Sequence, residues 1–141
     1  MLAAEAPVQP AHVAANRVQV AIVRLLNRAR APYGLPRLRM TSGLNRIAAS
    51  HSQDLAAHGM FSHSSSDGTS FADRIRRVTG ANFVGGNLME MTGRATASRV
   101  VQAWMNSPPH RADILMPGFR HVGVGTASSG AMVVVTADFT S

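Results

Sequence analysis

Apolar residues recur at the spacing of an amphipathic helix in two long segments of the first half of the chain. Between residues 13 and 29 the apolar stripe is Val18, Ile22, Leu25, Leu26 and Ala29. Between residues 41 and 60 the corresponding stripe is Leu44, Ile47, Ala48, His51 and Leu55. Apolar side chains three and four positions apart lie on one face of a helix. The pattern therefore predicts two helices that each bury one face, the second ending near Gly59.

Two shorter segments also carry helix signals. Residues 71–78 follow Thr69 and Ser70, either of which can serve as an N-cap. Residues 96–106 place an apolar stripe around Trp104, which we expect to be a core anchor. Both segments therefore predict short helices that pack on the core.

The end of the chain has the pattern of a β-hairpin. Residues 121–127 and 131–139 are rich in valine and are joined by Ser-Ser-Gly. Gly123 and Gly125 alternate with valines, so one face of the first strand is almost bare and lets a helix approach closely. Residues 81–91 are too rich in glycine for a helix, and we expect a strand there. Helices followed by a terminal hairpin predict an α+β fold.

Length and composition predict one domain. A chain of 141 residues that is 45% hydrophobic can bury one core of ordinary size. We expect residues 1–12, which are rich in Ala and Pro, to form an N-terminal extension, and residues 13–141 to form the domain. No run approaches the ~18 apolar residues of a membrane span, so we expect no transmembrane segment.

Cysteine usage and charge restrict the chemistry. The chain has no cysteine, which excludes disulfides and thiolate sites. Its net charge is +7, which favours anionic partners. However, the arginines are spread over the chain and only 5% of residues are aromatic, so few side chains could stack on bases. The sequence favours a solvated basic surface, and we expect no nucleic-acid binding.

Two histidines lie outside the apolar stripes. His63 lies in a loop of small polar residues, and His110 lies in the first turn of a helix predicted over residues 107–116 with Ser107 at its N-cap. The positive end of the helix dipole disfavours imidazolium there, so His110 should be neutral and able to accept a hydrogen bond or bind a metal. Both could equally be ordinary loop histidines. His51 and His58 continue an apolar stripe and are expected in the core.

Acidic and hydroxyl side chains offer weaker candidates. No glycine-flanked serine elbow surrounds Ser64–Ser66, so no nucleophile is predicted there. Asp113 is expected to be a structural first-turn acid of the helix that carries His110.

The order of these motifs resembles the CAP superfamily of cysteine-rich secretory, antigen 5 and pathogenesis-related-1 proteins. The resemblance covers residues 17–139 and rests on "FSHSSSDG" and "AWMNSPPHRADILMPGFRHVGVG" at this separation. It implies an α-β-α sandwich in which helices cover both sides of a small antiparallel sheet of about three strands. In its lack of cysteine the chain resembles the bacterial branch of the family, whose members lack the disulfides of the eukaryotic proteins.

The resemblance also implies where a site lies. The two histidines of the family's cleft match His63 and His110, but one family glutamate falls on Gly86 and the other has no acid at its matching position. Gly86, Asn87 and Glu90 belong to the expected ligand-binding cleft. Glu90 lies four residues after Gly86, on the same face of an ideal strand but about 13 Å away. We therefore expect a degenerate acidic site, in which His63 and His110 bind Zn²⁺ weakly and Ca²⁺ or Mg²⁺ hardly at all.

Three functions follow from these expectations. The first is an exported module, secreted or associated with the cell envelope, whose histidine cleft binds a lipid or an anionic envelope polymer. The alternative is a divalent-metal-dependent, protease-like hydrolase in which His63 and His110 hold the metal. The third is a docking role of the exposed arginines. The catalytic residues, the ligand and the oligomeric state are left open.

Overall fold

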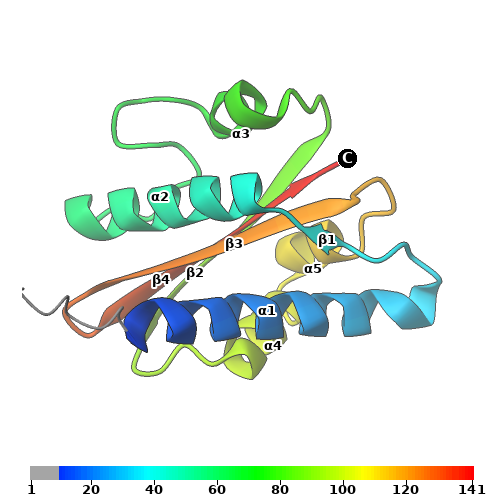
Figure 1. Cartoon of the computed structure of the whole chain (residues 1–141), viewed down its shortest axis with the longest axis horizontal. Coiled ribbons are helices and arrows are strands. Elements are labelled where there is room, and N and C mark those ends of the chain that lie inside the picture. Colours follow the sequence, from blue (N-terminus) through cyan, green and yellow to red (C-terminus); the bar gives the residue numbers. More distant parts are fainter. Residues whose placement is uncertain (1–9) are drawn as a thin grey trace, which may run out of the picture.

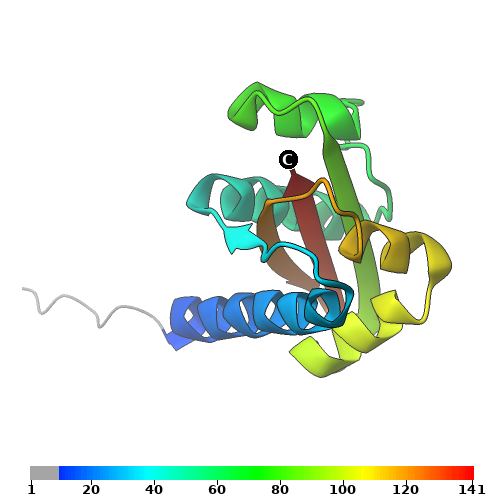
Figure 2. The ribbon, with the colours of Figure 1, turned by 90° about the vertical axis from the view of Figure 1, so that its right-hand side faces the viewer.

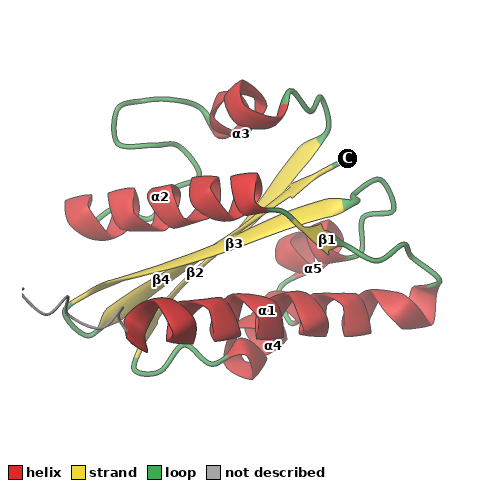
Figure 3. Cartoon of the chain, viewed as in Figure 1, coloured by secondary structure: helices red, strands yellow, loops and turns green. Residues whose placement is uncertain are grey.

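A computed structural model describes the backbone of residues 10–141 and the side chains of residues 17–141. Figures 1 and 3 show the elements, which in chain order are α1 (Pro10–Arg30), the 3-10 helix η1 (Ala31–Tyr33), β1 (Arg39–Met40), α2 (Ser42–His58), α3 (Phe71–Thr79), β2 (Val84–Thr92), α4 (Ala97–Met105), α5 (Pro108–Ile114), β3 (His121–Ser129) and β4 (Met132–Thr140). Every predicted helix and strand is present. The boundary proposed at residues 12 and 13 falls inside α1, and residues 1–9 lie outside the described part.

The helix ends follow the capping signals of the sequence. The side chain of Ser70 accepts a hydrogen bond from the N–H of Asp73, which makes Ser70, not Thr69, the N-cap of α3. Helix α2 begins after Thr41, whose hydroxyl accepts from the N–H of Leu44. It ends at Gly59, which has a φ of 59°, a left-handed conformation that glycine adopts without steric cost.

The sheet has four strands in the order β1-β3-β4-β2. Strands β2 and β3 both pair antiparallel with β4, and each ladder runs the full length of the strands without a bulge. Strand β1 pairs parallel with β3 through Arg39 and Met40. The expected sheet of about three antiparallel strands is therefore corrected to four, of which one is parallel. A strand of two residues is too short to show the alternation that identifies strands in a sequence.

The helices cover both faces of this sheet, which confirms the α-β-α sandwich. Helices α2 and α3 lie on one face and α1, α4 and α5 on the other (Figure 2). The larger core cluster lies under α1, α4 and α5 and includes the fully buried side chain of Trp104. Its indole N–H donates to the carbonyl of Leu88 over 2.9 Å, so α4 supplies a hydrogen-bond partner for a backbone carbonyl of the edge strand β2.

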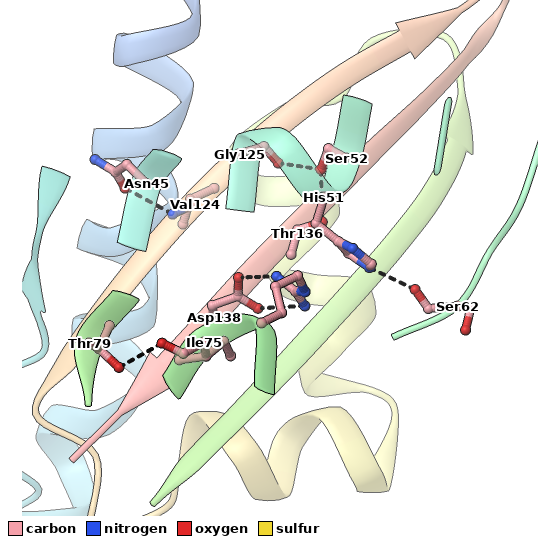
Figure 4. Close-up of polar contacts among 11 residues, drawn as sticks. Asn45, His51, Ser52, Ser62, Ile75, Thr79, Val124, Gly125, Thr136 and Asp138 are labelled. Atoms are coloured by element: carbon pink, nitrogen blue, oxygen red, sulfur yellow. Dashed lines mark hydrogen bonds and ion pairs between the residues drawn. The ribbon is translucent and has the colours of Figure 1, made fainter. Parts of the chain in front are cut away.

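The close approach predicted at Gly123 and Gly125 is confirmed. A Cβ on Gly123 would lie 2.1 Å from the carbonyl carbon of Leu44, and a Cβ on Gly125 would lie 2.0 Å from the amide nitrogen of Ala49. The side chain of Asn45 accepts from the N–H of Val124 over 2.9 Å in the same contact (Figure 4). Helix α2 thus packs directly on the backbone of β3.

Two expectations about single residues are corrected. His51 is buried as predicted, but His58 is exposed because it belongs to the last turn of α2, beyond the part that the sheet covers. The sequence favours a solvated basic surface, yet the side chain of Arg74 is only 10% exposed. Arg17, Arg24 and Arg28 are exposed, as the amphipathic pattern of α1 predicts. None of the helices over residues 10–141 is long and apolar enough to cross a membrane.

Candidate functional site

His63 lies in the loop between α2 and α3. A hydrogen bond with the buried side chain of His51 fixes the preceding residue, Ser62. The Nε2 of His51 lies 2.7 Å from the carbonyl oxygen of Ser62 (Figure 4). Because a carbonyl only accepts, Nε2 carries the hydrogen and Nδ1 is the unprotonated nitrogen of a neutral ring. The ring of His63 packs edge-on against Phe71, with 5.5 Å between the ring centroids. The buried side of α2 therefore positions the loop at His63.

His110 lies near the start of α5, and two contacts fix its position. Its Nδ1 shares a hydrogen bond of 2.9 Å with the hydroxyl of Ser107. Ser107 is the N-cap residue as predicted, but its hydroxyl serves His110 and makes no capping bond to a helix N–H. The side-chain amide of Asn87 donates to the carbonyl of His110 over 3.1 Å, which ties α5 to β2.

The fold brings these two histidines together from different layers of the sandwich. Phe71, which supports His63, lies against Gly86, and His110 is bonded to the next residue of β2, Asn87. Burial lowers the pKa of His63 from its ordinary value, and the charges of Arg74 and His110 lower it further. Burial also lowers the pKa of His110. The direction predicted for His110 is confirmed, but its cause is desolvation. Both imidazoles are therefore neutral at neutral pH.

A buried ion pair lies beside His63. The guanidinium of Arg74 contacts the carboxylate of Asp138 through two hydrogen bonds of 2.8 and 3.4 Å. Burial raises the pKa of Asp138 to about 6, although its bonds to Arg74 act in the opposite direction. The Nε of Arg74 has no hydrogen-bond partner among the described residues. Arg74 thus supplies a cation whose field reaches His51 and His63.

The carboxylate of Asp113 lies beside the backbone at the position of the missing family glutamate. It accepts a hydrogen bond from the backbone N–H of Gly86, which lowers its pKa. Burial has the larger effect and raises the pKa to about 6. Asp113 lies in the last turn of α5, so the prediction of a first-turn acid is wrong. Its position three residues after His110, on the same side of a helix, was the available signal.

The remaining predicted residues occupy different environments along β2. A Cβ on Gly86 would lie 2.7 Å from the ring of Phe71, so that ring fills the space into which a side chain at Gly86 would point. Asn87 is fully buried, and its Oδ1 has no hydrogen-bond partner in the described part. Glu90 is exposed and pairs with Val134 in a ladder without a bulge, so it is about 13 Å from Gly86 along the strand.

The residues of this site do not fit a catalytic zinc ion. Such an ion usually has three protein ligands, whereas the site offers two neutral imidazoles. Within residues 17–141 no group of three or more His, Asp or Glu side chains has the arrangement to hold a metal.

The α-β-α sandwich, with helices on both faces of a four-stranded sheet, defines the structural class of this domain. The family model described as the cysteine-rich secretory protein family, CAP, matches residues 23–139. The chain therefore belongs to the CAP family. It has no cysteine and its similar sequences are bacterial, in agreement with the cysteine-free bacterial branch.

Three similar proteins illustrate the relationship. The uncharacterized protein YkwD of Bacillus subtilis is 36% identical over 113 residues, which is 79% of this chain and 43% of that protein. The crystal structure of an extracellular protein with an SCP domain from Bacillus anthracis has a TM-score of 0.80 and 27% identity, covering 96% of this chain and 45% of that one. An outer surface protein of Borrelia burgdorferi has a TM-score of 0.72 and 20% identity, covering 84% and 88%. The chain thus spans less than half the length of the two Bacillus proteins.

Proposed function

We propose that this CAP domain is an exported module that binds a polar ligand in a cleft around His63 and His110. The observation that carries the proposal is the convergence of two neutral imidazoles, those of the exposed His63 and the partly buried His110, from opposite layers beside Gly86 and Asn87. A neutral imidazole both donates and accepts a hydrogen bond, which suits recognition of hydroxyl, carbonyl or phosphate groups.

The net charge of the chain favours an anionic ligand. Arg74 is close enough to influence His63, and the chain carries a net charge of +7. Glu90, the remaining acid of the predicted cleft, is exposed farther along β2. We therefore propose a lipid with an anionic head group or an anionic envelope polymer as the ligand.

Export is supported by similarity. The Bacillus anthracis relative is described as extracellular. A domain without cysteine needs no oxidising compartment to fold, and export does not conflict with its composition. We propose that the chain is secreted or associated with the cell envelope.

The test is a ligand survey on matched variants. Native mass spectrometry of the purified protein and binding to a panel of anionic lipids and envelope polymers would be measured for the wild type, His63→Ala, His110→Ala and His58→Ala. His58 is an exposed histidine of α2 and serves as the control. We expect a ligand whose affinity falls at least tenfold in the first two variants and is unchanged in His58→Ala. Absence of any bound ligand, or equal binding by all four proteins, would contradict the proposal.

A metal-dependent hydrolase is the second candidate, and one observation favours it. The Asp113 carboxyl, with a pKa raised to about 6, would titrate near the range that suits a general base. Calorimetric titration of Zn²⁺ separates the candidates. The binding module predicts no tight zinc site in the wild type, and zinc binding gained when Gly86→Glu is combined with Phe71→Ala, which clears the space for the new side chain. Tight wild-type zinc binding that is lost in His63→Ala would favour the hydrolase.

A further inference from the structure

A groove between α1 and β1 lies at the edge of the sheet opposite to β2 and the histidine pair. It encloses about 710 Å³. Its apolar lining includes Val20, Val23 and Met40, of which Val20 is 43% and Met40 39% exposed. Its polar lining includes Arg24, Arg37 and Arg39, all of them exposed.

The three arginines have no carboxylate partner in the described part of the chain. Over residues 17–141 the ion pairs are His58–Asp54 and Arg74–Asp138, and no acid lines the groove. Three cations gathered around an apolar floor repel one another, and they attract a partner that carries negative charge. Because the floor is apolar, that partner must also supply apolar groups, which a uniformly charged polymer does not.

The backbone of β1 indicates how such a partner would lie. The N–H groups of Arg39 and Thr41 donate to the carbonyls of Arg120 and Val122, so both point toward β3. The N–H and carbonyl of Met40, between them, therefore point away from β3 at the outer edge of the sheet.

The preceding residue on that edge is already paired by a side chain. The amide of Asn27 accepts from the N–H of Leu38 over 2.7 Å and donates to its carbonyl over 3.0 Å. Asn27 thus makes the two bonds that a neighbouring strand would make, and Met40 offers the next position along the same edge.

We propose that this groove binds an extended acidic peptide segment of a partner protein, which adds to the sheet beside β1. Peptides that add a strand obtain affinity from main-chain hydrogen bonds and specificity from alternate side chains. The alternation of Arg37 and Arg39 along the chain requires acidic residues at alternate positions of the peptide, and Val20 and Met40 receive apolar residues between them.

Fluorescence anisotropy with a labelled peptide of alternating Glu and Val residues tests this inference. The proteins would be the wild type, the double variant Arg37→Glu with Arg39→Glu, and the double variant Arg76→Glu with Arg77→Glu. Arg76 and Arg77 are exposed on α3, so the two variants have the same net charge. We expect the groove variant to bind at least tenfold more weakly than the wild type and the control variant to change by less than twofold. His63→Ala should bind like the wild type, which keeps this result independent of the histidine pair.

Three outcomes would overturn the inference. Equal loss in both double variants would mean attraction by overall charge. No binding by the wild type at millimolar peptide would mean that the groove takes no acidic strand. Binding of phosphatidylglycerol vesicles that is lost in the groove variant, without peptide binding, would assign the groove to a lipid surface. Circular dichroism of each variant would confirm that it is folded.

Discussion

At the scale of single residues, Arg30 shows how this domain buries a positive charge with backbone carbonyls in place of an acidic partner. Its guanidinium is 1% exposed and donates to the carbonyls of Pro36, Ile114, Met116 and Phe119 over 2.8 to 3.2 Å. Burial lowers the pKa of Arg30, and the nearby Arg120 lowers it further. The residue joins the end of α1 to the end of α5 and the segment that follows it, so its role is to fix these two helices against each other on one face of the sheet.

A conservative replacement at Arg30 should therefore be costly. Lysine has a single charged nitrogen and cannot reach four carbonyls arranged around a planar group. Buried acceptors left without donors cost about 1–3 kcal/mol each, so we expect Arg30→Lys to lower the free energy of unfolding by ~3 kcal/mol. Urea denaturation measures this, with the exposed Arg28→Lys as control. Equal stability of the two variants would contradict the role given to Arg30.

Asp113 gives a prediction of pH dependence. Its folded pKa of about 6 lies above the unfolded value, so between the two the folded state binds more protons. This carboxyl therefore contributes a loss of stability as the pH rises from about 4 through 6. Asp113→Asn removes the titration and can still accept from the N–H of Gly86.

We expect Asp113→Asn to gain roughly 1 kcal/mol over the wild type between pH 4 and pH 7.5, a value discounted because the side chain is only half-buried. Chemical denaturation at several pH values measures the difference. The matched control is Glu90→Gln, an exposed carboxylate of β2. If the free energy of unfolding of Asp113→Asn differed from that of the wild type by the same amount at every pH, this would contradict a raised pKa of Asp113.

At the scale of elements, the contact of α2 with β3 depends on two glycines. Because the atoms that a Cβ on Gly125 would meet belong to the backbone of α2, the helix as a whole must move to accommodate it. Overpacking by one methyl usually costs 1–3 kcal/mol, and we expect Gly125→Ala to reach about 3 kcal/mol. In contrast, a Cβ on Gly43 of α2 meets nothing within 4 Å, so Gly43→Ala should stabilise the helix by up to ~1 kcal/mol. Thermal unfolding compares the two variants, and a similar effect of both would contradict direct packing of α2 on β3.

Most elements could be predicted from the sequence because each carries its own local signal. The stripes of α1 and α2 extend over several turns, and the alternation of Gly123 and Gly125 with valines predicts the close approach of a helix. Strand β1 could not be predicted, since two residues show no periodicity and its pairing with β3 joins positions about eighty residues apart. His58 was misplaced because an apolar stripe does not show where the covered part of a helix ends.

At the scale of the whole molecule, the candidate site was only partly predictable. His63 and His110 lie within motifs that resemble the family, so they could be named from the sequence. Arg74 could not, because its partner Asp138 is 64 positions away, whereas Asp113 could have been found from its position three residues after His110 on the same helix. Long-range pairing of charged groups depends on which strands are neighbours, which local patterns do not report.

His63 and His110 are proposed to form one site. Nuclear magnetic resonance titration of the imidazole protons tests it most directly in the wild type, in His110→Gln, which keeps a polar side chain, and in His58→Ala as control. We predict that the pKa of His63 lies below the ordinary histidine value of about 6.5 in the wild type. It should rise in His110→Gln, because one of the charges that lower it has been removed, and stay unchanged in His58→Ala. An identical pKa of His63 in all three proteins would show that the two rings do not share a site.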